Sequence, residues 1–266
     1  MSDRKPNFIL VPDANEPPDP PPRGDLGSVF GRLGALVTAA KDAMLPVRLG
    51  LRHADPPPVA ADDRPTKPRL IFGFDATASR EPAWETARQV TDALVQALPG
   101  VLEVALAVHG GSRLHTFTGF TNDARTLRDL AAGITCRAGY TQLLPILAGS
   151  LDRAGVRVVT YIGDVFEESL RRGQKLADTM GSRGIKLIIL HDTSDWNARR
   201  DAEIFLDLAR RTGGCVLPFD ATAPGRLRDL LAAIAVYAVG GRDLLEENLK
   251  QLPGAPALLQ YLDGEN

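Results

Sequence analysis

The chain has 266 residues, a formal net charge of −2 at pH 7 and a sequence pI of about 6.1. This length allows one domain of α/β size plus tails. Hydrophobic residues make up 44% and charged residues 24%, which is normal for a globular protein. This charge gives no electrostatic basis for binding nucleic acid, and no apolar run approaches the ~20 residues that cross a bilayer.

The two cysteines, Cys136 and Cys215, stand far apart in the sequence and form no C-x-x-C pair. This usage argues against a disulfide framework and against a zinc site, and it fits a reducing compartment. The first six residues lack the apolar stretch of a signal peptide. We therefore expect a cytoplasmic protein without a membrane span.

Residues 1–67 form a proline-rich tail, because most of the 20 prolines lie at or before Pro68. Such runs favour extended polyproline II structure and cannot build a core, so we expect the tail to be largely disordered. It contains one predicted amphipathic helix at about residues 25–44, with apolar residues three and four apart. We expect this helix to dock on the globular domain or on a partner, since its few cations disfavour a membrane surface.

Apolar strands and amphipathic helices alternate over residues 68–241, and a helical tail follows at 242–266. The alternation predicts a doubly wound α/β domain with a mostly parallel six-stranded sheet and helices on both faces. Gly110 and Gly111 leave room only for a tight turn, so the third strand is predicted to be an antiparallel edge strand. The predicted strands are residues 70–74, 101–108, 114–117, 156–162, 185–190 and 215–218, and the predicted helices are 82–98, 121–133, one ending at 151, 167–183, 201–211, 223–239 and 242–252. In the helix at 121–133, Leu127 and Leu130 are predicted to face inward and Thr121 or Asn122 to cap the start.

Polar side chains follow the first strand abruptly. Asp75 ends the apolar run, and Thr77 and Ser79 follow at alternate positions. A carboxylate and two hydroxyls on one loop can converge on a single point, and such hard oxygen ligands suit Mg²⁺ or Mn²⁺ better than zinc or copper. The alternative interpretation is that these residues only cap the helix that begins after them.

Two further candidates are Thr141, which precedes the fourth strand, and Asp164, which follows it. In open parallel sheets, ligands bind at the carboxyl ends of the strands, where the strand order reverses. If the first and fourth strands are neighbours, Asp75 and Asp164 face the same crevice.

The set Asp75-x-Thr77-x-Ser79, Thr141 and Asp164 resembles the metal-ion-dependent adhesion site (MIDAS) of von Willebrand factor A (vWA) domains, over about residues 67–241. That family carries D-x-S-x-S on the first loop, so Thr77 replaces a serine and keeps the hydroxyl. Many members have Asp-Gly after the fourth strand, where this chain has Gly163 before Asp164.

The resemblance is to bacterial intracellular members of the family, which often work beside ATPases, chaperones, kinases or phosphatases. It implies that Asp75, Thr77 and Ser79 hold Mg²⁺ or Mn²⁺, and that Thr141 and Asp164 bind the ion directly or through water. It also implies that an Asp or Glu of a partner protein completes the coordination, and hence that the protein is a non-enzymatic adaptor.

Two other functions stay open at this point. Phosphatases of the haloacid dehalogenase type also place an Asp after the first strand, but their D-x-D-x-[TV] pattern needs a second carboxylate where Thr77 stands. A structural scaffold with a degenerate metal site is the other. His191 and Asp192 either rim the same pocket or cap a loop. Glu167 and Glu168 either add negative charge around the site or are the acidic residues that are usual at a helix start.

Overall fold

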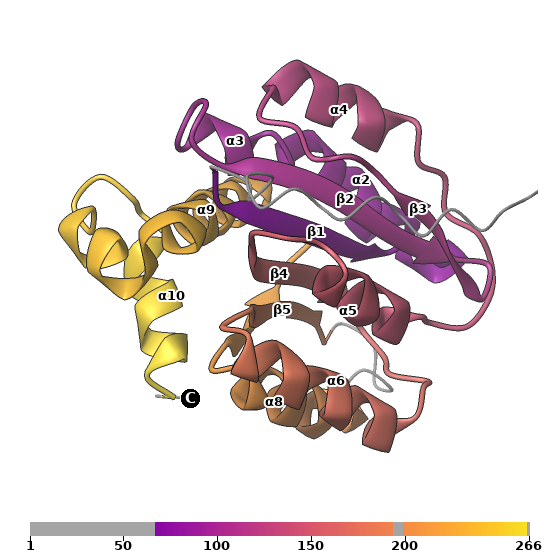
Figure 1. Ribbon diagram of the computed structural model, residues 1–266. Coiled ribbons are helices and arrows are strands. Elements are labelled where there is room, and N and C mark those ends of the chain that lie inside the picture. The colour runs from indigo at the N-terminus through magenta and orange to yellow at the C-terminus, as the bar shows by residue number, and fades with distance from the viewer. Residues whose placement is uncertain (1–66, 194–198, 265–266) are drawn as a thin grey trace, which may run out of the picture. The chain divides into compact units, whose positions relative to one another are not determined.

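The computed structural model describes residues 67–193 and 199–264, so the predicted helix at about 25–44 lies outside the described residues. Within them, six strands form one sheet in the order β3-β2-β1-β4-β5-β6 (Figure 1). Neighbouring strands are parallel except β2 and β3, which are antiparallel, so the predicted sheet is confirmed. The strands are β1 (Arg69–Asp75), β2 (Glu103–Gly110), β3 (Arg113–Phe117), β4 (Val156–Gly163), β5 (Lys186–Asp192) and β6 (Cys215–Phe219).

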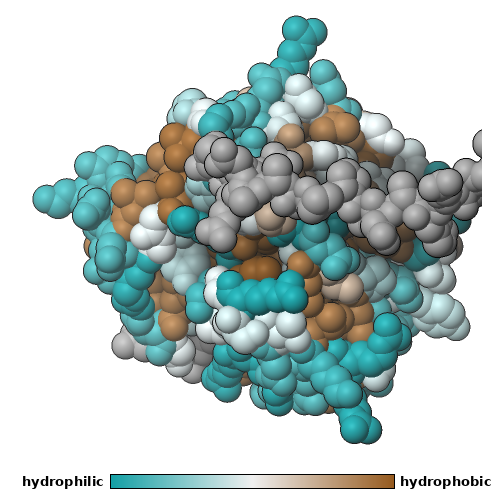
Figure 2. Space-filling model, in the orientation of Figure 1, coloured by the Kyte–Doolittle hydropathy of each residue, from teal (hydrophilic) through white to brown (hydrophobic). Residues whose placement is uncertain are grey.

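Helices cover both faces of the sheet, as expected for strands that are apolar on both sides (Figure 1). The surface over α6 (Leu170–Ser182) and α8 (Ala202–Arg211), in the lower part of Figure 2, is mainly hydrophilic, so these helices are amphipathic. One face packs against α5 (Leu143–Leu151), α6 (Leu170–Ser182) and α8 (Ala202–Arg211), and the other against α2 (Glu81–Val90), α3 (Ala93–Gln96), α4 (Ala124–Ala132), α9 (Pro224–Glu247) and α10 (Ala255–Leu262).

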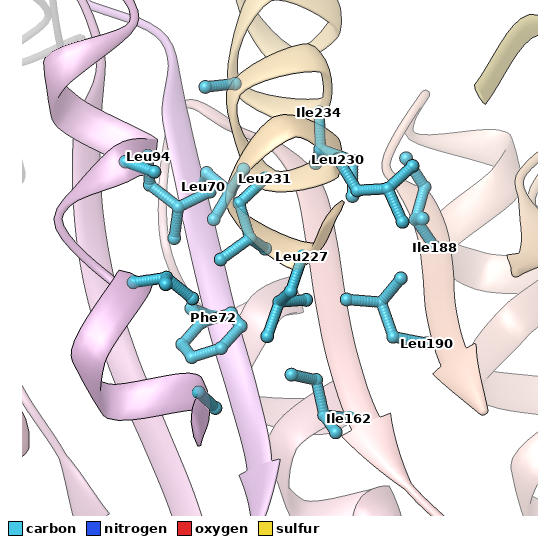
Figure 3. Close-up of a cluster of buried hydrophobic side chains, with 14 of the residues drawn as sticks. Leu70, Phe72, Leu94, Ile162, Ile188, Leu190, Leu227, Leu230, Leu231 and Ile234 are labelled. Carbon is cyan, nitrogen blue, oxygen red and sulfur yellow. The ribbon is translucent and has the colours of Figure 1, made fainter. Parts of the chain in front are cut away.

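The larger apolar cluster lies between the sheet and the helices α2, α3, α4, α9 and α10. Alternate residues of β1 face opposite sides, so Phe72 belongs to this cluster and Ile71 to the other. Burying each such side chain stabilises the fold by about 1.5–3 kcal/mol. Figure 3 shows apolar side chains of α9 lying over β1, β4 and β5, namely Leu227, Leu230, Leu231 and Ile234.

The C-terminal segment belongs to the same cluster. α9 has a non-helical residue at Gly241 (φ 68°), next to the predicted helix end, and Leu245 and Leu258 beyond it are fully buried. Within the described part of the chain, every helix is too short or too polar to cross a membrane.

The predicted single helix at 82–98 is wrong, because the chain forms α2 and α3 with a turn between them. In this turn, the Thr91 hydroxyl donates to the Ala87 carbonyl (2.8 Å). Asp92 is buried and accepts a hydrogen bond from Gln96 (2.9 Å). Hydroxyl bonds to a preceding carbonyl compete with helix geometry, and apolar spacing does not reveal them.

Two details of the predicted helix at 121–133 are also wrong. Asp123, rather than Thr121 or Asn122, caps α4 by accepting the Thr126 N–H (2.7 Å). Thr121 forms an isolated antiparallel bridge with Val104 instead. Leu130, predicted to face inward, is 37% exposed.

The strand order confirms that β1 and β4 are neighbours, with β2 on the other side of β1. Phe74 pairs with Ile162 and Asp75 pairs with His109. The carboxyl ends of β2, β1, β4 and β5 therefore meet along one edge of the sheet, at the point where the strand order reverses.

Candidate metal site

Asp75, the last residue of β1, is fully buried. Its Oδ1 accepts the Thr77 N–H (2.9 Å), while Oδ2 has no hydrogen-bond partner among the described residues. Burial, opposed by the hydrogen bonds from Thr77, raises the pKa of this carboxyl above its usual value. A buried oxygen without a partner costs free energy, which a proton or a cation would offset.

Asp164 follows the end of β4 and lies against Asp75. Burial is the main reason that its pKa rises to about 6; the Arg80 charge opposes the rise and the Asp75 charge adds to it. Its Oδ1 accepts the Val165 N–H (2.8 Å). The preceding Gly163 leaves room for the Tyr161 side chain, because a Cβ there would stand 2.5 Å from the Tyr161 ring.

The two hydroxyls of the first loop also lie together. The Thr77 and Ser79 oxygens are 3.4 Å apart, with Thr77 buried and Ser79 exposed. The loop is clamped at Ala76, whose N–H donates to the His109 carbonyl (2.8 Å) and whose carbonyl accepts the Arg137 N–H (2.8 Å). These backbone bonds fix where the hydroxyls stand relative to β1.

Thr141 is buried just before α5. Its N–H donates to Glu167 Oε2 (2.8 Å), and its hydroxyl accepts the Glu167 N–H (3.2 Å). The next residue, Gln142, donates its N–H to His109 Nδ1 (3.3 Å), and that nitrogen is 3.6 Å from Asp75 Oδ1. The loop of Thr141 therefore packs against the residues that surround Asp75.

The predicted helix at 167–183 begins only at Leu170, so Glu167 and Glu168 do not start a helix. Glu168 Oε2 accepts the Leu144 N–H (2.9 Å), as Glu167 accepts that of Thr141. Both acidic residues thus bind free N–H groups around the start of α5. The sequence shows the acidic pair but not the helix that receives it.

Sequence reasoning missed Arg80, whose side chain is only 6% exposed. Its Nη1 lies 2.7 Å from Asp192 Oδ2 and 3.7 Å from Asp164 Oδ2. With Asp75, this makes three carboxylates around one guanidinium, an excess of two negative charges when all are ionised. The available signals were the arginine directly after Ser79 and the aspartate that ends β5.

A neutral histidine of β2 lies beside Asp75. His109 Nδ1 accepts the Gln142 N–H, so Nε2 carries the proton and donates to the Tyr161 hydroxyl (2.8 Å). Burial, with a smaller effect of the His115 charge, lowers the pKa of His109 to about 3. His109 therefore brings Asp75 neither a positive charge nor a proton.

The donor set fits a hard divalent cation, since it consists of carboxylate and hydroxyl oxygens beside an orphaned carboxylate oxygen. In residues 67–193 and 199–264, no group of three or more His, Cys, Asp and Glu side chains is arranged to hold a metal ion. A site here thus depends on the hydroxyls of Thr77, Ser79 and Thr141 as well as on two carboxylates.

The sheet order, the antiparallel edge strand and the helices on both faces are those of a doubly wound α/β domain with its candidate site at the switch point. Comparison with solved structures specifies the class. The described chain has the fold of a vWA domain, and three of the matching structures are given below. No family model and no curated protein matches the sequence.

Von Willebrand factor type A from Catenulispora acidiphila matches with a TM-score of 0.53 at 16% identity, over 64% of this chain and 43% of that one. Mussel byssus proximal thread matrix protein 1, with a zinc-occupied MIDAS motif, matches with a TM-score of 0.51 at 12% identity, over 64% and 46%. Pilus adhesin SpaC from Lactobacillus rhamnosus GG matches with a TM-score of 0.52 at 11% identity, over 65% and 30%. The chain thus spans less than half the length of each, and identities this low show the fold alone.

Proposed function

We propose that the carboxyl edge of the sheet binds one divalent cation, Mg²⁺ or Mn²⁺, through Asp75, Thr77, Ser79, Thr141 and Asp164. The observation that carries this proposal is the buried, unpartnered Oδ2 of Asp75 beside Asp164. The raised pKa values indicate that the surrounding hydrogen bonds do not fully stabilise the two ionised carboxylates. A cation shared between them would stabilise both in the ionised form. The excess of two negative charges around Arg80 matches the charge of one such ion.

The bound cation would serve as a docking point for another protein. It would supply a positive charge with a coordination position open to one more oxygen, from water or from a partner's Asp or Glu. The chain's own residues would hold the ion and shape the surface around it. Tyr140 stands beside Thr141, is 67% exposed and is held by a bond from its N–H to Ser112 Oγ (2.9 Å). An exposed aromatic next to a charged docking point is typical of an interface.

On this basis the protein is a metal-dependent interaction module that acts as an adaptor in a bacterial complex in the cytoplasm, without a reaction of its own. The partner would present an acidic side chain, and ATPases, chaperones, kinases and phosphatases are the candidate classes. A structural scaffold is the second candidate function, because Arg80 already neutralises part of the carboxylate cluster.

Calorimetric titration of the full chain with MgCl₂ and MnCl₂ tests the metal site. We expect one site per chain in the natural protein and no binding in Asp75→Ala. Asp220→Ala is the matched control, since Asp220 follows β6 at the same edge of the sheet but is exposed. Equal binding by Asp75→Ala and the natural protein would refute the assignment.

Affinity capture from a bacterial lysate, with quantitative mass spectrometry, tests the docking role. Proteins captured in Mg²⁺ and lost in chelator, in Asp75→Ala and in Tyr140→Ala are the expected partners. Tyr140→Ala should weaken partner binding about tenfold while leaving the metal affinity unchanged. A partner that binds equally well in chelator and to Asp75→Ala would favour the scaffold.

A further inference from the structure

Arg80 is a buried cation on the loop that carries three of the proposed metal ligands. It directly follows Ser79, ends the short 3-10 helix η1 (Ala78–Arg80) and donates its backbone N–H to the Thr77 carbonyl (2.9 Å). Its side chain turns back into the domain, where it is 6% exposed. An arginine with this little exposure needs a charge partner, and it has two at different distances.

The guanidinium is not held equally by its two partners. Nη1 is at hydrogen-bond distance from Asp192 (2.7 Å) but 3.7 Å from Asp164, beyond that distance. Nε and Nη2 have no hydrogen-bond partner among the described residues. A buried arginine with a purely structural role usually forms hydrogen bonds with more of its five N–H groups than Arg80 does. The position is better explained by its charge than by its hydrogen bonds.

We propose that Arg80 is a built-in counter-ion of the carboxylate cluster, which stabilises the cluster without metal and lowers the affinity of the site for a divalent cation. This inference rests on the proposed function, because it concerns the same site. A cation bound to Asp164 would lie within a few ångströms of the guanidinium, where like charges repel strongly inside a protein. Asp192 draws the guanidinium away from Asp164 and thereby leaves that carboxylate available.

The consequence is a site that binds its cation weakly by itself. A carboxylate from a partner adds a negative charge beside the ion and offsets the repulsion from Arg80. Metal and partner would therefore bind cooperatively, each raising the affinity for the other.

Calorimetry on the full chain with MgCl₂ and MnCl₂ tests the role of Arg80. Arg80→Met keeps the length of the side chain and removes the charge, so we expect the dissociation constant to fall at least about tenfold. Arg80→Lys keeps the charge and should bind nearly as the natural protein does. Asp192→Asn frees the guanidinium to pair with Asp164, so binding should weaken. Thermal melting in chelator should show a lower melting temperature for Arg80→Met than for Arg80→Lys.

The outcomes separate this inference from the proposed function. Metal binding by Arg80→Met but not by the natural protein would support the counter-ion and refute a metal-dependent function. If the natural protein binds metal and Arg80→Met binds it equally well or more weakly, the counter-ion role of Arg80 is refuted and the proposed function is not. Absence of binding in both would refute both. If Arg80→Met does not fold, Asp192→Asn decides, and unchanged or tighter binding in that variant refutes the counter-ion.

Discussion

The same five residues, Phe-Asp-Ala-Thr-Ala, occur at the ends of β1 and β6, over residues 74–78 and 219–223. In both copies the aspartate Oδ1 accepts the N–H of the threonine two residues on, at 2.9 Å for Asp75 and 2.8 Å for Asp220. The local structure is thus repeated, because an Asp before such a turn binds its own backbone.

The surroundings of the two copies differ. Asp75 ends a central strand and is fully buried, whereas Asp220 follows the edge strand β6 and is exposed. Burial raises the pKa of Asp75, while hydrogen bonds from Thr222 lower that of Asp220. A short motif therefore becomes a candidate cation site only where strand order and neighbouring carboxylates make it one.

The largest effect on stability is expected at the buried phenylalanine that begins each copy of the motif. Phe74 is fully buried and packs on Trp84, with ring centroids 4.5 Å apart. Phe74→Ala should lower the free energy of unfolding by about 3–5 kcal/mol, through lost burial and a cavity. Phe219, on the edge strand and 6% exposed, should cost less when replaced by alanine. Urea unfolding of both variants checks this order, and an equal or larger loss for Phe219→Ala would contradict it.

The two aspartates should respond to the same substitution with opposite signs. In chelator, Asp75→Asn removes a buried carboxylate whose Oδ2 has no partner and should raise the free energy of unfolding by about 1 kcal/mol. Asp220→Asn removes an acceptor that Thr222 uses twice and should lower stability. Urea unfolding without metal measures both changes, and destabilisation by Asp75→Asn would show that Asp75 is already well satisfied.

The pH dependence should separate buried from exposed carboxylates. The folded-state pKa of Asp164 is raised from 3.8 to about 6, so in metal-free protein its contribution to stability is lost as pH rises through this window. The lowered pKa of Asp220 acts oppositely, because its contribution is lost as pH falls below 3.8.

Unfolding curves of Asp164→Asn and the natural protein should therefore diverge between about pH 4 and about pH 6, with the natural protein losing relative stability as pH rises. Because the cation must displace the proton, Mg²⁺ binding should be roughly tenfold weaker at about pH 5 than at about pH 7. A pH-independent affinity over this range would show that Asp164 is not a ligand.

The smallest effect is expected at the N-terminus. A protein that begins at Pro65 keeps both copies of the motif and omits most of the proline-rich tail. Since few backbone groups of such a tail can pair, its melting temperature and metal affinity should stay near those of the full chain. Loss of cooperative melting would mean that the predicted helix at about 25–44 belongs to the core.

The sequence predicted the sheet and the positions of Asp75 and Asp164 because both follow apolar strands, and the ends of such strands are visible in the pattern. It placed Asp192 near this pocket but did not predict its contact with Arg80, because the two residues are 112 positions apart in the chain. The sequence also did not show which of two neighbouring residues caps α4. Thr121 and Asp123 are both acceptable helix caps, but Thr121 pairs with Val104 in an isolated β-bridge, so Asp123 is the residue that caps α4. Leu130 fits the apolar spacing of α4 but lies at its exposed margin.

Crystals of the full chain grown with Mn²⁺ test the central claim most directly, because manganese is located by its anomalous scattering. The expected result is one anomalous peak at about 2 Å from the Asp75 carboxylate and the hydroxyls of Thr77 and Ser79. No corresponding peak should lie beside Asp220, which carries the same local motif on the exposed edge strand. The absence of a peak at Asp75 at saturating Mn²⁺, or a peak beside Asp220 alone, would contradict the metal site proposed for this edge of the sheet.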